Sequence, residues 1–282
     1  MFNRRNIIIA AVVAAAGILL LLMLGGGGSD DKPRVKIQEG TANAQSQQEA
    51  APQELFEQAM AYKAEGELPK AQQILRLIYN EYIDYEHIEE VQRELEAINM
   101  RIIFSNAPSP SAVIHEVVKG DTLGELAKKY GTTIELIKRS NNLDSNIIRI
   151  GQKLRIWRGE FNIFVDKSQN ILILKEGDNV IKVYNVSTGK NNSTPVGSFK
   201  ITSKLTDPVW FNKGVVVPPE SPANVLGSRW LGFDIPGYGI HGTVDPDKIG
   251  QQVTAGCVRM RNSDVEELYS IIPVGTQVAI VN

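Results

Sequence analysis

The stretch Ile240 to Met260, I-H-G-T-V-D-P-D-K-I-G-Q-Q-V-T-A-G-C-V-R-M, decides how the C-terminal part of the chain is interpreted. Cys257 is the only cysteine in 282 residues, and His241, sixteen residues before it, is one of three histidines. A free thiol has a pKa of about 8.5 and is mostly protonated at neutral pH, and an imidazole within hydrogen-bond distance can accept that proton. The two residues are therefore a candidate nucleophile and its base.

The residues next to Cys257 are small, which suits a reacting centre. Ala255 and Gly256 let a ligand approach the backbone closely, and the N–H groups of this turn can stabilise an oxyanion. The alternative is that Cys257 is a small buried apolar residue, as free cysteines usually are, and that His241 is structural.

The positions that flank the pair match a known pattern. They include Thr194-Pro195-x-Gly197, Pro222 to Phe233, His241-Gly242-Thr243, Pro246, Ile249-Gly250, Thr254-x-Gly256-Cys257-Val258-Arg259-Met260, Asp264, Leu268-Tyr269 and Pro273-x-Gly275-Thr276. Together these positions resemble the catalytic core of the YkuD-type L,D-transpeptidases, over residues 160–282. In that family the nucleophile is the Cys of a Ser/Thr-His-Gly-Cys segment, and the base is an upstream His in a His-Gly pair.

The resemblance implies a mostly-β sandwich with the catalytic Cys at the base of a cleft. It also implies an activity that needs no cofactor. Cys257 would attack a peptidoglycan tetrapeptide stem and form a thioester, while His241 donates and accepts the proton. An amine would then take the acyl group, which gives a cross-link between two stems or attaches a protein, and water is a third acceptor. The residues expected at the substrate and oxyanion positions are Gly242, Thr243, Thr254, Gly256 and Arg259.

Two of these expectations have structural alternatives. Arg259 is a candidate carboxylate anchor, because a guanidinium pairs with a carboxylate in two hydrogen bonds, or it forms a salt bridge that fixes the Cys loop. Ala255 stands where the family has a histidine that helps to arrange the thiolate. The competing hypothesis is therefore a catalytically weakened or inactive peptidoglycan-binding protein.

The N-terminal residues predict a membrane anchor. Residues 1–28 carry Arg4 and Arg5 ahead of the uninterrupted apolar run Ile7 to Leu24, which is just long enough to span a bilayer. The run is longer than the apolar region of a typical signal peptide, the alternative, and it ends in Met23-Leu24 followed by Gly25 to Gly28. The arginines before it predict a single-pass protein of the bacterial cell membrane, with its catalytic part on the periplasmic or cell-wall side. Residues 29–52 are predicted to form a linker.

The next segment, residues 53–104, is predicted to be helical. Ala71, Ile74, Leu75, Ile78 and Tyr79 recur at helical spacing. Part of this segment resembles a single tetratricopeptide-type helical pair, although such arrays normally need about three repeats. A spacer or dimerising element and a peptide-binding role are both open. A second linker is predicted over residues 105–112.

Residues 113–157 show a β-α-α-β pattern. They resemble the LysM carbohydrate-binding module through Gly120-Asp121-Thr122-Leu123, Ala127-x-x-Tyr130-Gly131, Asn141 and Ile150-Gly151-Gln152-x-Leu154. Asp121, Thr132 and, in the later domain, Ser263 are predicted helix caps, and His115 is predicted to be a strand surface residue. The resemblance implies a groove for N-acetylglucosamine-containing glycans. Its expected residues are Gly120, Asp121, Thr122, Leu123, Asn146, Ile147 and Ile148.

Composition excludes several other classes of protein. The net charge is −2, which gives no reason to expect a nucleic-acid partner, and one cysteine excludes internal disulfides. Three scattered histidines and one cysteine show no spacing typical of metal ligands. The fold class is therefore multidomain: a transmembrane helix, a small helical segment, a LysM module and a mostly-β catalytic domain.

Overall fold

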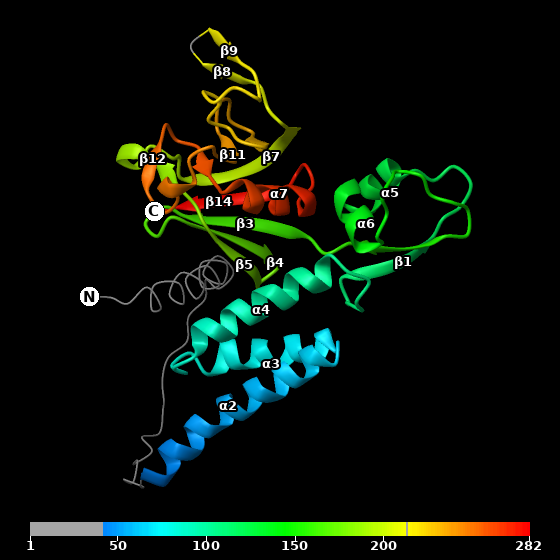
Figure 1. Ribbon diagram of the computed structural model, residues 1–282, viewed down its shortest axis with the longest axis vertical. Coiled ribbons are helices and arrows are strands. Elements are labelled where there is room, and N and C mark those ends of the chain that lie inside the picture. The colour runs from blue at the N-terminus through cyan, green and yellow to red at the C-terminus, as the bar shows by residue number, and fades with distance from the viewer. Residues whose placement is uncertain (1–41, 213) are drawn as a thin grey trace, which may run out of the picture. The chain divides into compact units, whose positions relative to one another are not determined.

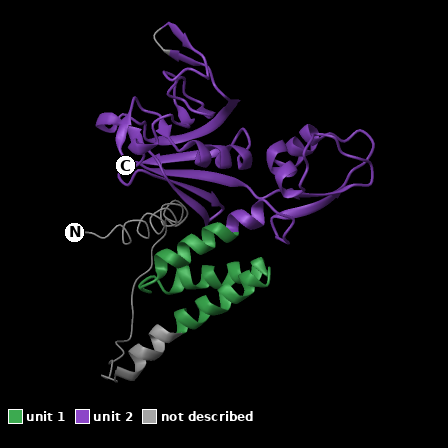
Figure 2. Cartoon of the chain, viewed as in Figure 1, with its two compact units in different colours: residues 1–98 green, residues 99–282 purple. Residues whose placement is uncertain are grey.

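The computed structural model describes residues 42–212 and 214–282, with side chains described from Ala51 onward except that of Asn212. The predicted anchor Ile7 to Leu24 lies outside this part of the chain. No helix in the described part is long and apolar enough to cross a membrane. The chain divides into two compact units, residues 1–98 and 99–282 (Figure 2).

The first unit consists of helices at the start of the described chain (Figure 1). Its elements are α2 (Ala42–Ala64), α3 (Leu68–Glu81) and most of α4 (Ile88–Ile103). Pro69 lies in the first turn of α3, where its missing N–H costs nothing, and Leu75 and Ile78 are fully buried at the helical spacing expected. The predicted linker is wrong in part, because α2 already begins at Ala42.

The second unit begins with the last residues of α4 and the predicted β-α-α-β module. The module consists of β1 (Ala112–Glu116), α5 (Leu123–Tyr130), α6 (Ile134–Ser140) and β2 (Lys153–Trp157). The two strands pair antiparallel, and Leu126, Ile137 and Leu154 lie in the core beneath the helices. The predicted order of elements is therefore confirmed.

The three predicted helix caps are wrong by one or two residues. Thr122, not Asp121, caps α5 by accepting from the Glu125 N–H at 3.2 Å. Likewise Thr133, not Thr132, caps α6, and the later helix α7 begins after Arg261 without a side-chain cap. A cap must have extended backbone just before the helix, and the sequence does not reveal which of two adjacent polar residues meets this condition.

Polar contacts fix this module within the second unit. Arg155, only 4% exposed, donates to the carbonyls of Ile102 and Ile103 at the end of α4. On α6, the Thr133 hydroxyl donates to the Ser270 carbonyl at 2.5 Å and Arg139 donates to the Ser270 hydroxyl at 2.9 Å. Residues 105–111, predicted as a linker, form a loop, but these contacts hold its two ends in place.

The rest of the second unit is the predicted mostly-β domain. Its main sheet contains β3 (Phe161–Asp166), β4 (Ile171–Glu176), β5 (Asn179–Asn185), β7 (Gly197–Thr206), β10 (Arg229–Phe233), β11 (Gly239–His241), β13 (Val258–Arg259) and β14 (Gln277–Val281). Smaller elements are β6 (Thr188–Gly189), η1 (Lys190–Asn192), β8 (Trp210–Asn212), β9 (Val215–Val217), η2 (Pro246–Lys248), β12 (Gln252–Thr254) and α7 (Asn262–Ile271).

One long strand connects the two halves of this domain. The first residues of β7 pair with β14, and its later residues pair with β10, so the order β13-β11-β10-β7-β14-β3-β4-β5 is continuous (Figure 1). The strands that were expected to form a β-sandwich therefore belong to one continuous hydrogen-bonded sheet. Helix α7 packs near β10 and β11 with Val265 and Leu268 fully buried, which supports the sheet edge where β11 and β13 lie.

Replacing Arg155 should destabilise the second unit. Arg155→Ala leaves two carbonyls at the end of α4 without their donor and removes a buried side chain, so we expect the free energy of unfolding to fall by about 2–4 kcal/mol. Urea unfolding of the full chain, followed by tryptophan fluorescence, measures this. Arg149→Ala, an exposed arginine of the same module, is the control, and equal effects of the two substitutions would contradict the proposed role.

Candidate active site

The site forms where β11 and β13 pair in parallel at the edge of the main sheet. This register sets Ile240 opposite Val258 and His241 opposite Arg259. Side chains alternate along a strand, and Val258 and Met260 are fully buried in the core. Cys257 and Arg259 therefore belong to the other face of the strand, which is also the face of His241.

His241 is buried and held by its own loop. It is 3% exposed, and its Nδ1 lies 2.6 Å from the Gly242 carbonyl oxygen. Because a carbonyl only accepts, the neutral ring carries its proton on Nδ1 and its lone pair on Nε2. Trp230, the residue opposite His241 on β10, stacks on the imidazole with ring centroids 6.1 Å apart.

The surroundings keep this imidazole neutral. Burial lowers the pKa of His241 to about 4, and the positive charge of Arg259 acts in the same direction. The carbonyls of Gly242 and Leu226 act in the opposite direction, because each favours a protonated ring nitrogen, but burial dominates. At neutral pH the ring is therefore a proton acceptor.

Cys257 lies next to residues 237–239, the segment that leads into β11. Its Sγ lies 3.5 Å from the Gly237 carbonyl oxygen, which accepts from the thiol. Burial raises the pKa of Cys257, while the Gly239 N–H and the charge of Arg259 stabilise the thiolate and act against this effect. Cys257 and His241 thus each use other hydrogen-bond partners here. Catalytic hydrogen bonds often tighten only when substrate binds.

The turn before Cys257 is fixed by Thr254. Its hydroxyl donates to the Cys257 carbonyl at 2.6 Å and accepts from the Gly256 N–H at 3.1 Å. Gly256 has φ +137°, and a Cβ there would lie 2.6 Å from the Tyr238 ring. In this structure the Gly256 N–H is already donated to Thr254, and its expected role at the oxyanion stays a prediction. Within the described chain the Cys257 N–H has no acceptor.

Asn262 organises the loop that follows His241 and was missed by the sequence analysis. Its Oδ1 accepts from the N–H groups of Thr243 at 3.0 Å and Ser228 at 3.2 Å. A Cβ on Gly242 would lie 2.2 Å from this oxygen, so glycine is needed there. Asn262 lies two residues after Met260 in the sequence. The pattern there predicts Ser263 as the helix cap and gives no reason to single out Asn262.

Comparisons with known proteins identify the family to which the chain belongs. The L,D-transpeptidase catalytic domain model matches residues 160–280, and the LysM domain model matches residues 115–157. The putative L,D-transpeptidase YqjB of Bacillus subtilis is 41% identical over 130 residues, which is 44% of this chain and 73% of that protein. The putative L,D-transpeptidase YkuD of Bacillus licheniformis is 33% identical over 176 residues, which is 60% of this chain and 98% of that protein. The chain belongs to the L,D-transpeptidase family.

Arg259 and the predicted residues of the LysM domain differ in their contacts and in their exposure. Arg259 has a buried Nε without a hydrogen-bond acceptor, and no carboxylate of the described residues lies within salt-bridge distance of it. In the LysM domain, Leu123 belongs to the core, so its side chain cannot contact glycan as predicted, whereas Ile147 is 76% exposed. His115, predicted at the surface, bonds to Tyr130 and Asp121.

No metal site is evident in residues 42–212 and 214–282. No group of three or more His, Cys, Asp and Glu side chains in that part of the transpeptidase could hold a metal ion.

Removing the Asn262 oxygen should loosen the site. Asn262→Leu leaves two backbone N–H groups without an acceptor, so we expect a loss of about 1–3 kcal/mol in stability and a fall of roughly tenfold or more in D-Ala release from a tetrapeptide stem. Asn262→Asp keeps the accepting oxygen and is the matched control. An Asp variant as impaired as the Leu variant would show that the oxygen is not what matters.

The buried imidazole should also affect stability at low pH. An unfolded His takes up a proton near pH 6.5, and His241 does so only near pH 4, so the unfolded state binds more protons between these values and stability falls as pH is lowered through this window. His241→Gln should remove about 2–3 kcal/mol of this loss. Urea unfolding of both proteins at pH 7 and pH 4.5 tests this, and parallel pH curves would contradict it.

Proposed function

We propose that this transpeptidase transfers an acyl group from a peptidoglycan tetrapeptide stem through a thioester on Cys257. The Cys257 sulfur attacks the carbonyl of the third residue, a diamino acid, as His241 Nε2 accepts the thiol proton. The peptide bond to the terminal D-Ala breaks, and the imidazolium returns the proton to the departing amine. D-Ala leaves, and the stem stays bound as a thioester.

The second half of the reaction releases the acyl group. An acceptor amine attacks the thioester carbonyl, His241 removes a proton from the amine, and the Cys257 thiol is regenerated. A second stem peptide as acceptor gives a cross-link between stems. A lysine on an envelope protein and water are the other acceptors.

The observation that carries the proposal is the strand register that sets His241 opposite Arg259, two residues after Cys257. The low pKa of His241, about 4 because of burial, keeps the base neutral at the pH where it must accept a proton. The free Cys257 N–H is the oxyanion donor in this scheme. Ala255 is exposed, and Thr254 holds the turn, so the turn does not depend on a side chain at position 255.

The LysM domain implies binding to the glycan of peptidoglycan. We propose the exposed loop residues Thr122, Asn146 and Ile147 as its contact surface. We further propose that residues 7–24 anchor the chain in the bacterial cell membrane, with the catalytic domain on the outer side. The arginines before that apolar run support this orientation.

Intact-protein mass spectrometry tests the reaction directly. After the full chain is mixed with a disaccharide-tetrapeptide, we expect an acyl adduct and released D-Ala with the wild type, and neither with Cys257→Ala. Because the side chain is small and partly exposed, Cys257→Ala should keep its thermal unfolding midpoint, which separates lost chemistry from lost folding.

Ala255→His distinguishes the two functional hypotheses. We expect an unchanged or higher rate of D-Ala release, because the new side chain projects from an exposed position. No adduct with wild type, together with an adduct for Ala255→His, would favour the inactive peptidoglycan-binding protein. No adduct with either protein would reject the proposed nucleophile.

A further inference from the structure

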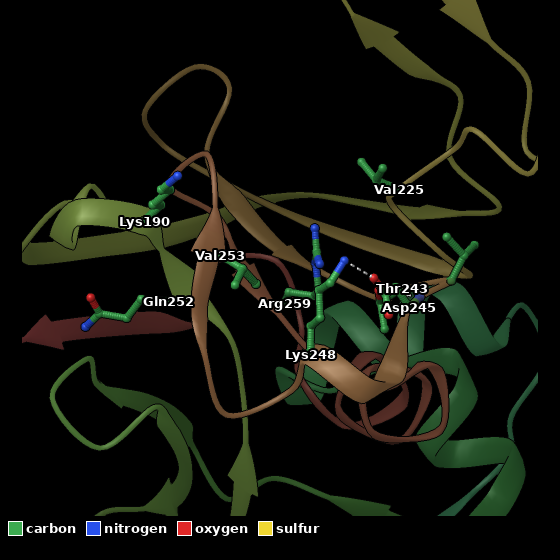
Figure 3. A pocket seen from close by; sticks show the side chains of 9 residues that line it. Lys190, Val225, Thr243, Asp245, Lys248, Gln252, Val253 and Arg259 are labelled. Atoms are coloured by element: carbon green, nitrogen blue, oxygen red, sulfur yellow. Dashed lines mark hydrogen bonds and ion pairs between the residues drawn. The ribbon is translucent and has the colours of Figure 1, made fainter.

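A separate pocket lies beside the catalytic pair. It has a volume of about 470 Å³ and is formed by residues from five separate stretches of the chain (Figure 3). Its lining residues are Lys190, Val225, Thr243, Val244, Asp245, Lys248, Gln252, Val253 and Arg259. Neither Cys257 nor His241 lines it, so the catalytic chemistry leaves the purpose of this pocket unexplained.

The charges in this pocket do not balance. Three lining side chains are cations and one is a carboxylate, Asp245, whose Oδ2 lies 2.6 Å from Lys248 Nζ. Figure 3 shows this ion pair as a dashed line next to Arg259. In the described chain neither Lys190 nor Arg259 has a carboxylate within salt-bridge distance. Three cations and one carboxylate give the lining a net charge of +2, although the charge of Asp245 also acts on Arg259 and raises the pKa of its guanidinium.

The Arg259 guanidinium is prepared for an anion. Its Nε is buried and has no hydrogen-bond acceptor, and burial lowers the pKa of the group. A buried donor without a partner is costly, whereas a guanidinium and a carboxylate form two strong parallel hydrogen bonds. A ligand carboxylate would remove this cost.

Three of the other lining side chains are apolar, while Thr243 and Gln252 are polar. Val225, Val244 and Val253 face the same space as the cations. An occupant with an aliphatic stem and a carboxylate at its end would satisfy both parts of the lining.

Two residues of the pocket lining adjoin the catalytic pair along the chain or across the sheet. Arg259 is the strand partner of His241, and Thr243 follows His241 by two residues. A substrate with its reacting carbonyl at Cys257 therefore has this pocket within reach of an adjacent side chain or chain end.

We propose that this pocket binds a carboxylate of the stem peptide, held by Lys190 and Arg259, and that it makes the enzyme select stems in which that carboxylate is present and free. The inference rests on the proposed function. Two sources supply such a group: a carboxylate on the side chain of the third residue, as in 2,6-diaminopimelate, and the carboxylate of the terminal D-Ala.

Four tetrapeptides separate these sources. The third residue is 2,6-diaminopimelate or lysine, and the terminal D-Ala carries a free carboxylate or a carboxamide. For the full-length wild type, we expect kcat/KM for release of the fourth residue to fall at least tenfold when the recognised carboxylate is absent. A fall with lysine assigns the side-chain carboxylate, and a fall with the carboxamide assigns the chain end.

Variants connect this selectivity to the pocket. Lys190→Gln should lower kcat/KM about tenfold for peptides with the recognised carboxylate and less than twofold for peptides without it. Asp245→Asn adds one net positive charge and should lower KM for the same peptides only. Lys200→Gln, an exposed lysine of β7 outside the pocket, is the control and should match wild type.

The outcomes distinguish this inference from the proposed function. Equal turnover of all four peptides by wild type, or an equal loss for all four in Lys190→Gln, would overturn the carboxylate pocket while leaving the nucleophile intact. Absence of both turnover and a Cys257 adduct with every peptide would instead reject the proposed function, on which the pocket's role depends.

Discussion

The parallel pairing of β11 with β13 is the constraint on which the active site depends. β11 ends at His241 and β13 begins at Val258, so the pairing brings together two segments that are separated in the sequence. It also sets His241 opposite Arg259. Alternation along β13 then buries Val258 and Met260 and leaves Cys257 and Arg259 on the face of His241. The Asn262 oxygen holds the loop that leaves β11, and Thr254 holds the turn that enters β13. A shift of one residue in this pairing would send the nucleophile into the core.

Burial decides the electrostatics of this arrangement. Both catalytic groups lose water, so the pKa of His241 falls to about 4 and that of Cys257 rises. The resting pair is therefore a neutral imidazole and a protonated thiol, with proton transfer coupled to attack rather than completed beforehand. Arg259 lowers the pKa of both groups, because its positive charge disfavours imidazolium and favours thiolate. An anion bound to Arg259 would weaken both effects, so ligand binding in the adjacent pocket and the protonation state of the pair are physically connected.

The sequence predicted those parts of the molecule that depend on local pattern. The β-α-α-β module and the short strands of the catalytic domain follow from apolar periodicity. The roles of Cys257 and His241 rest on rare residue types and on the family resemblance, and they stay predictions. Thr122 and Thr133 cap their helices, and the predicted Asp121 and Thr132 do not. Which of two adjacent polar residues is the cap depends on backbone geometry, which the sequence does not reveal. The Gly256 N–H is taken by Thr254, and Leu123 is in a core. Asn262 and the pocket around Lys190 and Arg259 could not be predicted, since each depends on segments that only the folded sheet brings together.

The LysM domain is attached to the catalytic domain more firmly than its proline-containing loop suggested. Arg155 is buried against the end of α4, and Thr133 and Arg139 both bond to Ser270 on α7. Helix α7 packs in turn near β11, the strand that carries His241. The bonds to Ser270 therefore restrain the LysM domain against the helix that packs near the His241 strand. Peptidoglycan presents glycan and stem peptide on one polymer, so such an attachment would raise the effective concentration of stems that leave the strand at the matching distance, and it would disfavour stems in every other register.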